Sequence, residues 1–186
     1  MKDGLIYITG GARSGKSTFA ENLMLDKGHR ILYIATALPF DGEMRDRIKR
    51  HRQRRPSFWH TLEAYRDIGQ SLERKGERYH GILLDCVTVM ITNLLMDMGC
   101  KEGCPAPEET ARVEAAITSE IDSAIAGLRA WGDLGVIVSN EVGMGLVPDN
   151  PLGRLFRDIA GRANQRIASA ADTGYLMVSG IPIRIK

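Results

Sequence analysis

Short apolar runs rich in β-branched residues alternate with longer stretches of mixed polarity along most of the chain. Such runs are typical of strands buried in a parallel sheet, and the sequence predicts them at residues 5–9, 31–35, 81–85, 134–139 and 175–179. The stretches between them favour helices at residues 17–26, 41–54, 65–75, 86–98, 108–131 and 152–171. Strands that alternate with helices predict an α/β fold whose mostly parallel sheet is covered on both faces.

Two shorter segments complete the predicted sheet. Residues 58–62 favour a short strand, and residues 183–185 favour a last strand that pairs antiparallel with the strand before it. The length of 186 residues suits one compact domain, and no linker is long enough to divide the chain. We therefore expect a single domain over residues 1–186, built as a three-layer sandwich with an antiparallel edge strand.

The composition indicates what kind of core the protein has and argues against a nucleic-acid or membrane-spanning protein. Hydrophobic residues make up 44% of the chain and aromatic residues only 6%, which predicts a mostly aliphatic core. The net charge of +2 is too balanced to indicate a nucleic-acid partner. The apolar runs are shorter than the roughly 18 residues of a membrane span, and no targeting segment is visible. We expect a cytoplasmic protein with no membrane span.

The cysteines indicate neither a disulfide framework nor a structural zinc site. Their odd number (Cys86, Cys100 and Cys104) argues against a disulfide framework. Cys100 and Cys104 share a stretch with glycine and proline, but a zinc site would need two more ligands that are missing nearby. The sequence therefore favours surface thiols in a loop.

The segment after the first predicted strand matches the pattern G-x-x-x-x-G-K-[ST]. Glycines let the backbone curl so that its N–H groups face phosphate oxygens, and the next helix adds positive charge at its N-terminus. Lys16 could bridge the β- and γ-phosphates, and the Ser17 hydroxyl could ligate Mg²⁺. The pattern predicts a P-loop NTPase-like fold whose phosphate-binding loop is formed by Gly10, Gly11, Ala12, Arg13, Ser14, Gly15, Lys16 and Ser17.

Two acidic residues follow buried strands. Asp85 ends the strand at 81–85, where it could hold Mg²⁺ or could cap the next helix. Glu141 follows the strand at 134–139, and ligands of open parallel sheets bind beyond the carboxyl ends of the strands. Glu141 could ligate metal, position a substrate hydroxyl or act as a base, or it could be a turn acid bonded to nearby amides.

Residues 45–55 carry seven basic side chains around His51. The run could be a solvated helix face, a nucleic-acid patch or a site for phosphate groups. Aromatic residues are not interleaved with it, which disfavours nucleic acid. An imidazole among cations resists protonation, so His51 could attack phosphorus, or it could be an ordinary surface histidine.

In their order, these motifs resemble the bifunctional adenosylcobinamide kinase / adenosylcobinamide-phosphate guanylyltransferase family of cobalamin biosynthesis. The resemblance runs from about Leu5 to Lys186. It rests on residues 9–17, 32–36, 47–48 with 51 and 55–56, 85 with 92–95, 140–145, 156–158 and 179–182. It implies that a nucleoside triphosphate, ATP or GTP, phosphorylates adenosylcobinamide. GMP would then pass from GTP to adenosylcobinamide phosphate through a GMP-histidine intermediate.

The resemblance also implies roles for individual residues. His51 would be the nucleophile, in a site where Ser17 and Asp85 are the residues expected to hold Mg²⁺. The base that activates the cobinamide hydroxyl is not identified, and Glu141 and Asp85 are both candidates. A homotrimer is implied as well. Besides the phosphate-binding loop, the implied nucleotide contacts are Ala35, Thr36, Ala37, Arg52, Gln53, Arg54, Arg55, Glu63 and Asp85.

Two rival hypotheses remain open from the residues alone. One is a simple P-loop small-molecule kinase in which His51 is idle. The other is a nucleotide-gated binding or assembly module similar to the RecA-type ATPases. Turnover of adenosylcobinamide separates this module from either enzyme, and covalent labelling of the protein by GTP separates the two enzymes.

Overall fold

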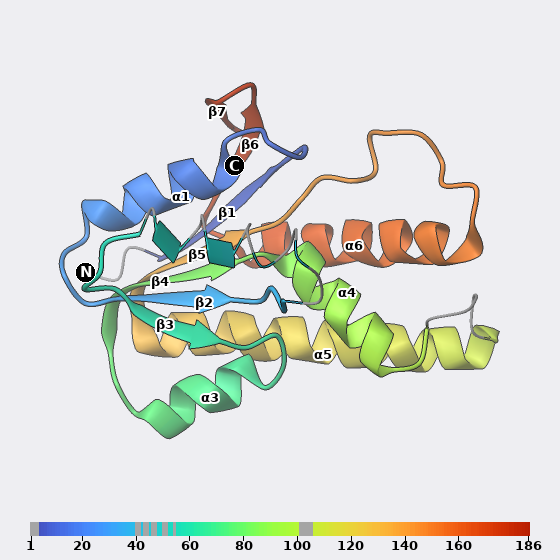
Figure 1. Ribbon diagram of the computed structural model, residues 1–186, viewed down its shortest axis with the longest axis horizontal. Coiled ribbons are helices and arrows are strands. Elements are labelled where there is room, and N and C mark those ends of the chain that lie inside the picture. Colours follow the sequence, from blue (N-terminus) through green and yellow to red (C-terminus); the bar gives the residue numbers. More distant parts are fainter. Residues whose placement is uncertain are drawn as a thin grey trace.

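The computed structural model describes residues 4–39, 42, 45, 48, 49, 52, 53, 55–100 and 106–186. Seven strands form one sheet in the order β3-β2-β4-β5-β1-β6-β7, and all neighbours are parallel except β6 and β7 (Figure 1). The strands are β1 Gly4–Gly10, β2 Ile31–Ala35, β3 His60–Glu63, β4 Tyr79–Asp85, β5 Gly132–Val138, β6 Thr173–Val178 and β7 Ile181–Arg184.

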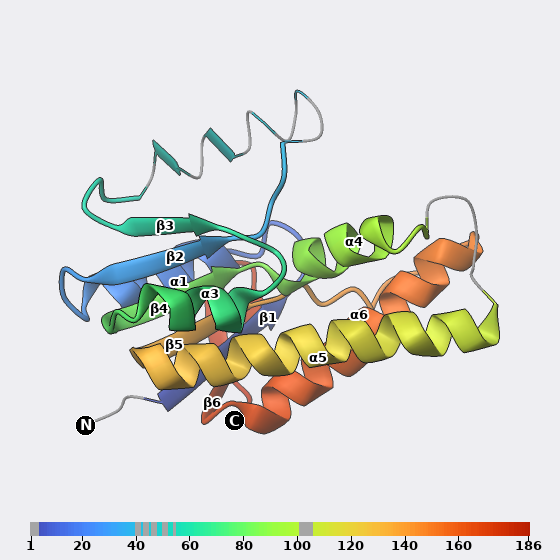
Figure 2. The ribbon, with the colours of Figure 1, turned by 90° about the horizontal axis from the view of Figure 1, so that it is seen from below.

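Helices cover both faces of this sheet. Helix α1 lies on one face, and helices α3, α4, α5 and α6 lie on the other, where α5 and α6 run side by side (Figures 1 and 2). The bounds are α1 Lys16–Leu25, α3 Ile68–Lys75, α4 Val87–Asp97, α5 Pro107–Trp131 and α6 Pro151–Ala170. The predicted three-layer α/β sandwich with a mostly parallel sheet and an antiparallel edge strand is confirmed. No helix in the described ranges is long and apolar enough to cross a membrane.

Alternating side chains explain why the sheet has two cores. On β2, Ile31 and Tyr33 face α1, whereas Leu32 and Ile34 face the opposite helices. Because both faces are covered, the central strands carry continuous apolar runs, such as Ile31–Ala35 of β2, rather than apolar residues at every second position. Both cores are mostly aliphatic, as the composition predicted.

Helix α3 begins later than the pattern over 65–75 predicted. The backbone N–H groups of Asp67 and Ile68 donate to the Glu120 carboxylate of α5, at 2.9 and 3.0 Å. The Glu120 side chain therefore accepts hydrogen bonds from the backbone N–H groups where α3 begins. Since Glu120 is distant in the sequence, the local pattern cannot reveal this start. The predicted helix over 41–54 is helical at its described positions 42, 45, 48, 49, 52 and 53, and its other residues lie outside the described part of the chain.

The expectation that Cys100 is a surface thiol was wrong. Gly99 has φ of 83° after the end of α4, and Cys100 donates its N–H to the Leu95 carbonyl at 3.1 Å. This Schellman-type ending turns the chain back, so that Cys100 is 4% exposed and packs in the core beside α5. Cys104 lies outside the described residues.

Candidate functional site

The phosphate-binding loop joins β1 to α1 at the carboxyl edge of the sheet. Gly10 and Gly15 have φ of 150° and 94°. A Cβ on Gly10 would lie 2.5 Å from the Met177 carbonyl oxygen, and one on Gly15 would lie 3.2 Å from Gly180 Cα. Glycine is required at both positions because the loop lies directly against the β6–β7 turn, whose Gly180 N–H donates to Ser14 O at 3.0 Å.

Lys16 occupies the place that the pattern assigns to the phosphate-facing cation. Its side chain is buried, and Nζ donates to the Gly11 carbonyl at 2.5 Å and to Ser14 Oγ at 3.4 Å. These contacts hold the ammonium group against the concave side of its own loop. A phosphate in the loop would meet a charge that is already in position.

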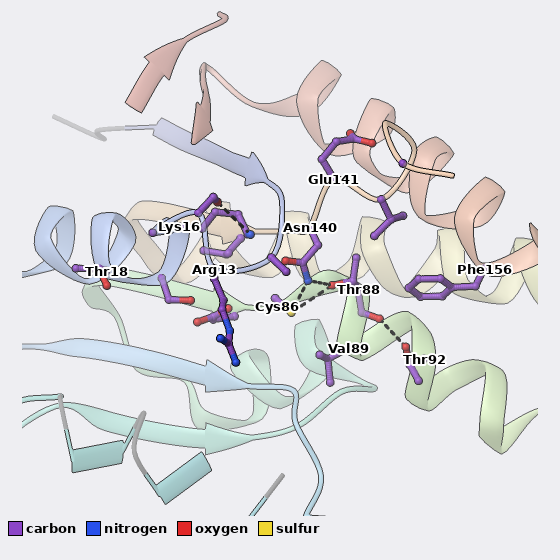
Figure 3. A pocket seen from close by; sticks show the side chains of 18 of the residues that line it. Arg13, Lys16, Thr18, Cys86, Thr88, Val89, Thr92, Asn140, Glu141 and Phe156 are labelled. Carbon is purple, nitrogen blue, oxygen red and sulfur yellow. Dashed lines mark hydrogen bonds between the residues drawn. The ribbon is translucent and has the colours of Figure 1, made fainter. Parts of the chain in front are cut away.

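A cleft of about 1230 Å³ opens beside this loop (Figure 3). The carboxyl ends of β1, β4 and β5, which are neighbours in the sheet, supply its floor. It is therefore the crevice that an open parallel sheet offers to a ligand. Its predicted lining residues are Ala12, Arg13, Ser14, Gly15, Lys16, Ser17, Gln53, Asp85 and Glu141.

A smaller pocket of about 80 Å³ adjoins the cleft and shares Ser17 and Asp85 with it. The segment 35–37 and Arg55 form its other predicted walls. The Thr36 hydroxyl accepts from Cys86 N at 2.9 Å and donates to Cys86 O at 2.8 Å. The segment after β2 is thus fixed to the segment after β4, where the two cavities share lining residues.

Asp85 is held by a tyrosine rather than by a helix end. The N-cap of α4 is Cys86, so the alternative interpretation of Asp85 as a helix cap was wrong. The Tyr33 hydroxyl donates to Asp85 Oδ2 at 2.8 Å. Burial, and then the neighbouring carboxylate, raise the pKa of the Tyr33 phenol far above its usual value, which keeps this proton on the tyrosine.

The residues that face the site fit a magnesium ion. Ser17 and Asp85 place a hydroxyl and a carboxylate on the walls of the same two cavities. Mg²⁺ binds through oxygen, commonly to one or two protein groups, with water and phosphate oxygens completing its shell. Within the described ranges no cluster of three or more His, Cys, Asp or Glu side chains that could hold a metal ion occurs.

A polar network supports the segment after β5 (Figure 3). The Asn140 side-chain amide donates to Thr88 Oγ1 at 2.6 Å, across the cleft floor. Asn164 of α6 donates to the Asn140 carbonyl at 3.0 Å and accepts from the buried Ser139 hydroxyl at 2.6 Å. Since each partner is itself bonded, the turn that leads into Glu141 is preorganised.

Glu141 stands on the same edge as the phosphate-binding loop. Its backbone N–H donates to Gly10 O at 2.9 Å, which ties the two segments together. Its Oε1 accepts from Gly143 N at 2.7 Å, and the side chain is partly buried in the cleft wall. Glu141 is therefore both an acid bonded to a backbone amide of its own turn and a residue of the cleft wall.

The remaining predicted residues separate into two groups. Glu63 is exposed at the end of β3, where it pairs in register with Ala35, and Arg52 is exposed as well. Neither lines the two cavities among the residues that the structure describes. His51 and Arg54 lie outside the described residues, so their predicted roles stay predictions.

Sequence reasoning missed several residues of the cleft. Thr88 and Thr92 are polar positions one turn apart on a mostly apolar helix, and this spacing could have signalled a face that borders a site. Tyr33 gave no signal, because a tyrosine in a buried strand looks like core. Phe156 of α6 reaches the cleft only through tertiary packing.

Similar proteins place these features in a family. The chain matches the family described as cobinamide kinase / cobinamide phosphate guanyltransferase over residues 6–185. It is 47% identical over 182 residues to the bifunctional adenosylcobalamin biosynthesis protein CobU of Salmonella typhimurium, covering 98% of this chain and 99% of that protein. The protein of the same description from Escherichia coli is 47% identical over 184 residues, with 98% and 99% covered.

More distant relatives agree. The bifunctional adenosylcobalamin biosynthesis protein CobP of Pseudomonas aeruginosa is 38% identical over 182 residues, covering 96% of this chain and 95% of that protein. A solved ATPase structure from a bacterial type III secretion system superposes with a TM-score of 0.56 over 93% of this chain and 50% of that chain, at 12% identity, which shows a shared fold alone. The resemblance predicted from the ordered sequence motifs is thus confirmed, and this chain belongs to the cobinamide kinase / cobinamide phosphate guanyltransferase family.

Proposed function

We propose that this protein phosphorylates adenosylcobinamide with a nucleoside triphosphate and then transfers GMP from GTP to adenosylcobinamide phosphate. The products of the second step are adenosylcobinamide-GDP and pyrophosphate. The observation that carries the proposal is one cleft in which the phosphate-binding loop, Asp85 and Glu141 meet, in a chain of this family. The match to this family favours the bifunctional enzyme over the two rival hypotheses, which were a simple kinase with an idle His51 and a nucleotide-gated binding module.

In the first step the loop would hold the triphosphate while the cobinamide hydroxyl attacks the γ-phosphorus. Backbone N–H groups of the loop, the α1 N-terminus and Lys16 would offset the charge that develops on the β–γ bridging oxygen. Ser17 and Asp85 would hold Mg²⁺, which when bound neutralises charge on the phosphate oxygens. The bond from the γ-phosphorus to that bridging oxygen breaks as the new P–O bond forms.

Glu141 is the better candidate for the base that accepts the hydroxyl proton. Asp85 already accepts the Tyr33 hydroxyl and faces Ser17, which suits a metal ligand rather than a base. Glu141 stands across the cleft on a preorganised turn. General base catalysis contributes about 10²–10⁴-fold to a rate.

Replacing Glu141 by glutamine is therefore expected to slow phosphorylation of adenosylcobinamide by about 100-fold or more. Guanylyl transfer to supplied adenosylcobinamide phosphate should stay within about threefold, because a phosphate nucleophile has no hydroxyl proton to lose. Initial rates of both steps, followed by mass spectrometry, check this, with Glu73→Gln on exposed α3 as the matched control. Equal losses in both steps would show that Glu141 only supports the loop.

In the second step His51 would attack the α-phosphorus of GTP and release pyrophosphate. The nitrogen–phosphorus bond of the GMP-histidine would then break as an oxygen of adenosylcobinamide phosphate attacks. Arg52, Gln53, Arg54 and Arg55 would contact the nucleotide phosphates, and segment 35–37 with Glu63 would contact the rest of the nucleotide. The arginine-rich run suits this work because guanidinium groups bind phosphate through paired hydrogen bonds.

The homotrimer implied by family resemblance is also proposed, with β7 as part of the contact between copies. Ile181 and Ile183 of this edge strand are 64% and 47% exposed, and Ile185 just after it is 55% exposed; a second copy would cover them. Light scattering should give three times the mass of one 20.5 kDa chain. The double variant Ile181→Lys/Ile183→Lys should give a lower mass; an unchanged trimer would place the contact elsewhere.

Turnover of the corrinoid tests the proposed function itself. The purified protein with Mg²⁺ and ATP should convert adenosylcobinamide into its phosphate, and added GTP should convert that phosphate into adenosylcobinamide-GDP. Hydrolysis of nucleotide with the corrinoid left unchanged would reject the proposal.

A further inference from the structure

We propose that Tyr33 is a positioning residue that sets Asp85 and Arg55 in a single arrangement, its hydroxyl holding the acid and its ring holding the cation. This inference rests on the proposed function, which makes Asp85 a magnesium ligand and Arg55 a nucleotide contact. None of the steps above uses Tyr33, although it lines the smaller pocket with both residues.

The sheet register brings the three residues together. Ala35 of β2 pairs with Asp85 of β4, so Tyr33, two residues earlier on the same strand, points to the same face as Asp85. Tyr33 also pairs with Thr61 of β3, and Arg55 Nη1 donates to Thr61 Oγ1 at 3.5 Å. The tyrosine thus lies between the acid on one neighbouring strand and the arginine beside the other.

The hydroxyl restricts the Asp85 carboxylate. Its bond to Oδ2 is 2.8 Å long, and the Tyr33 side chain is only 3% exposed. Water cannot easily replace this donor, because the tyrosine is buried on β2 among apolar residues of the α1-side core. A carboxylate with one oxygen fixed loses less freedom when it binds a cation, which is how groups behind a metal ligand raise its affinity.

The ring restricts Arg55. The Arg55 Cζ atom lies 3.8 Å from the centroid of the Tyr33 ring, within the range of a strong cation–π contact. A phenol that donates its proton toward a carboxylate gains electron density on its ring, and this strengthens the attraction of the face for a cation. The Asp85 contact and the Arg55 contact therefore support each other through Tyr33.

The chain contains a natural control for this arrangement. Tyr79 also has a buried ring, donates its hydroxyl to Glu77 Oε2 at 3.2 Å and has Arg30 Cζ 5.6 Å from its ring centroid. It lies at the first residue of β4, at the opposite end of this strand from Asp85. A purely structural effect of losing a buried phenol hydroxyl should appear at both tyrosines, whereas an effect on the site should appear at Tyr33 alone.

The test compares Tyr33→Phe with Tyr79→Phe by electron paramagnetic resonance of Mn²⁺, titrated into the protein bound to guanosine 5′-(α,β-methylene)triphosphate. We expect Tyr33→Phe to weaken Mn²⁺ binding in this ternary complex by about 10-fold, and Tyr79→Phe to leave it unchanged. The variant Tyr33→Leu should in addition weaken binding of the analogue in EDTA, where only the Arg55 contact is probed. Melting temperatures report the structural loss separately.

Equal Mn²⁺ affinity in wild type and Tyr33→Phe would overturn the inference, as would equal losses in Tyr33→Phe and Tyr79→Phe. A wild-type protein that binds no Mn²⁺ with the analogue would also overturn it. The experiment needs no corrinoid, so failure of adenosylcobinamide turnover would reject the proposed function while this result still decides the role of Tyr33.

Discussion

Replacing His51 by alanine is expected to abolish covalent labelling of the protein by GTP labelled at its α-phosphate, and to lower guanylyl transfer by about 10³-fold or more. Phosphorylation of adenosylcobinamide should persist within about threefold, because γ-phosphoryl transfer to a hydroxyl needs no histidine nucleophile. The two activities of the family would thus separate at a single residue.

The measurement has two readouts that together identify the bond. Label on the wild-type protein should be lost in acid and retained in base, as expected of a phosphoramidate, and should be absent from His51→Ala. The control is His29→Ala, since His29 is exposed and its ring contacts Phe58 rather than the site. Label that survives in His51→Ala would refute this assignment, and loss of the kinase step in the same variant would assign His51 a different role.

Replacing Lys16 by methionine, whose uncharged side chain is only one atom shorter, is expected to lower both reactions by about 10³-fold. Lys16 would offset charge on the β- and γ-phosphates when the γ-phosphoryl group leaves, and on pyrophosphate when GMP leaves. One missing cation should therefore affect two chemically different steps. Steady-state rates of each step check this, with Lys27→Met on the exposed surface as control.

A folding defect can be told apart from this effect. Lys16 is buried and donates to Gly11 O at 2.5 Å, so its loss also removes a contact inside the loop. Circular dichroism melting of Lys16→Met measures that cost directly. If a folded variant lost only one of the two reactions, the triphosphate of the other reaction would have to bind outside this loop.

Local patterns predicted the scaffold of the site because they depend on neighbours in the sequence. The glycines that permit positive φ, the lysine and serine after them, and the acids after buried strands are all short-range signals. Parallel pairing of β1, β5 and β4 then brings Lys16, Glu141 and Asp85 to one edge, since these segments follow adjacent strands. Function-related residues at strand ends were therefore predictable without knowing the full strand order.

Residues that act through tertiary contacts were not predictable in this way. Tyr33 was expected in the core but lines the site, whereas Cys100 was expected on the surface but is buried. Tyr33 looks like core in the sequence, and only the register of β2 with β4 places its hydroxyl on Asp85. Cys100 looks like a loop thiol, and only the turn at Gly99 buries it. In both cases the role of the residue depends on a contact with a distant part of the chain, whose position the local sequence pattern does not determine.

If one phosphate-binding loop serves both transfers, the nucleotides of the two reactions must compete for it. Protein-bound GMP would be measured from α-labelled GTP with increasing adenosine 5′-(β,γ-imido)triphosphate, an ATP analogue with a blocked γ-phosphoryl bond. We expect competitive inhibition: a rising apparent KM for GTP with an unchanged maximal rate, at the analogue concentrations that inhibit the kinase step. Undiminished labelling at concentrations that abolish adenosylcobinamide phosphorylation would contradict it.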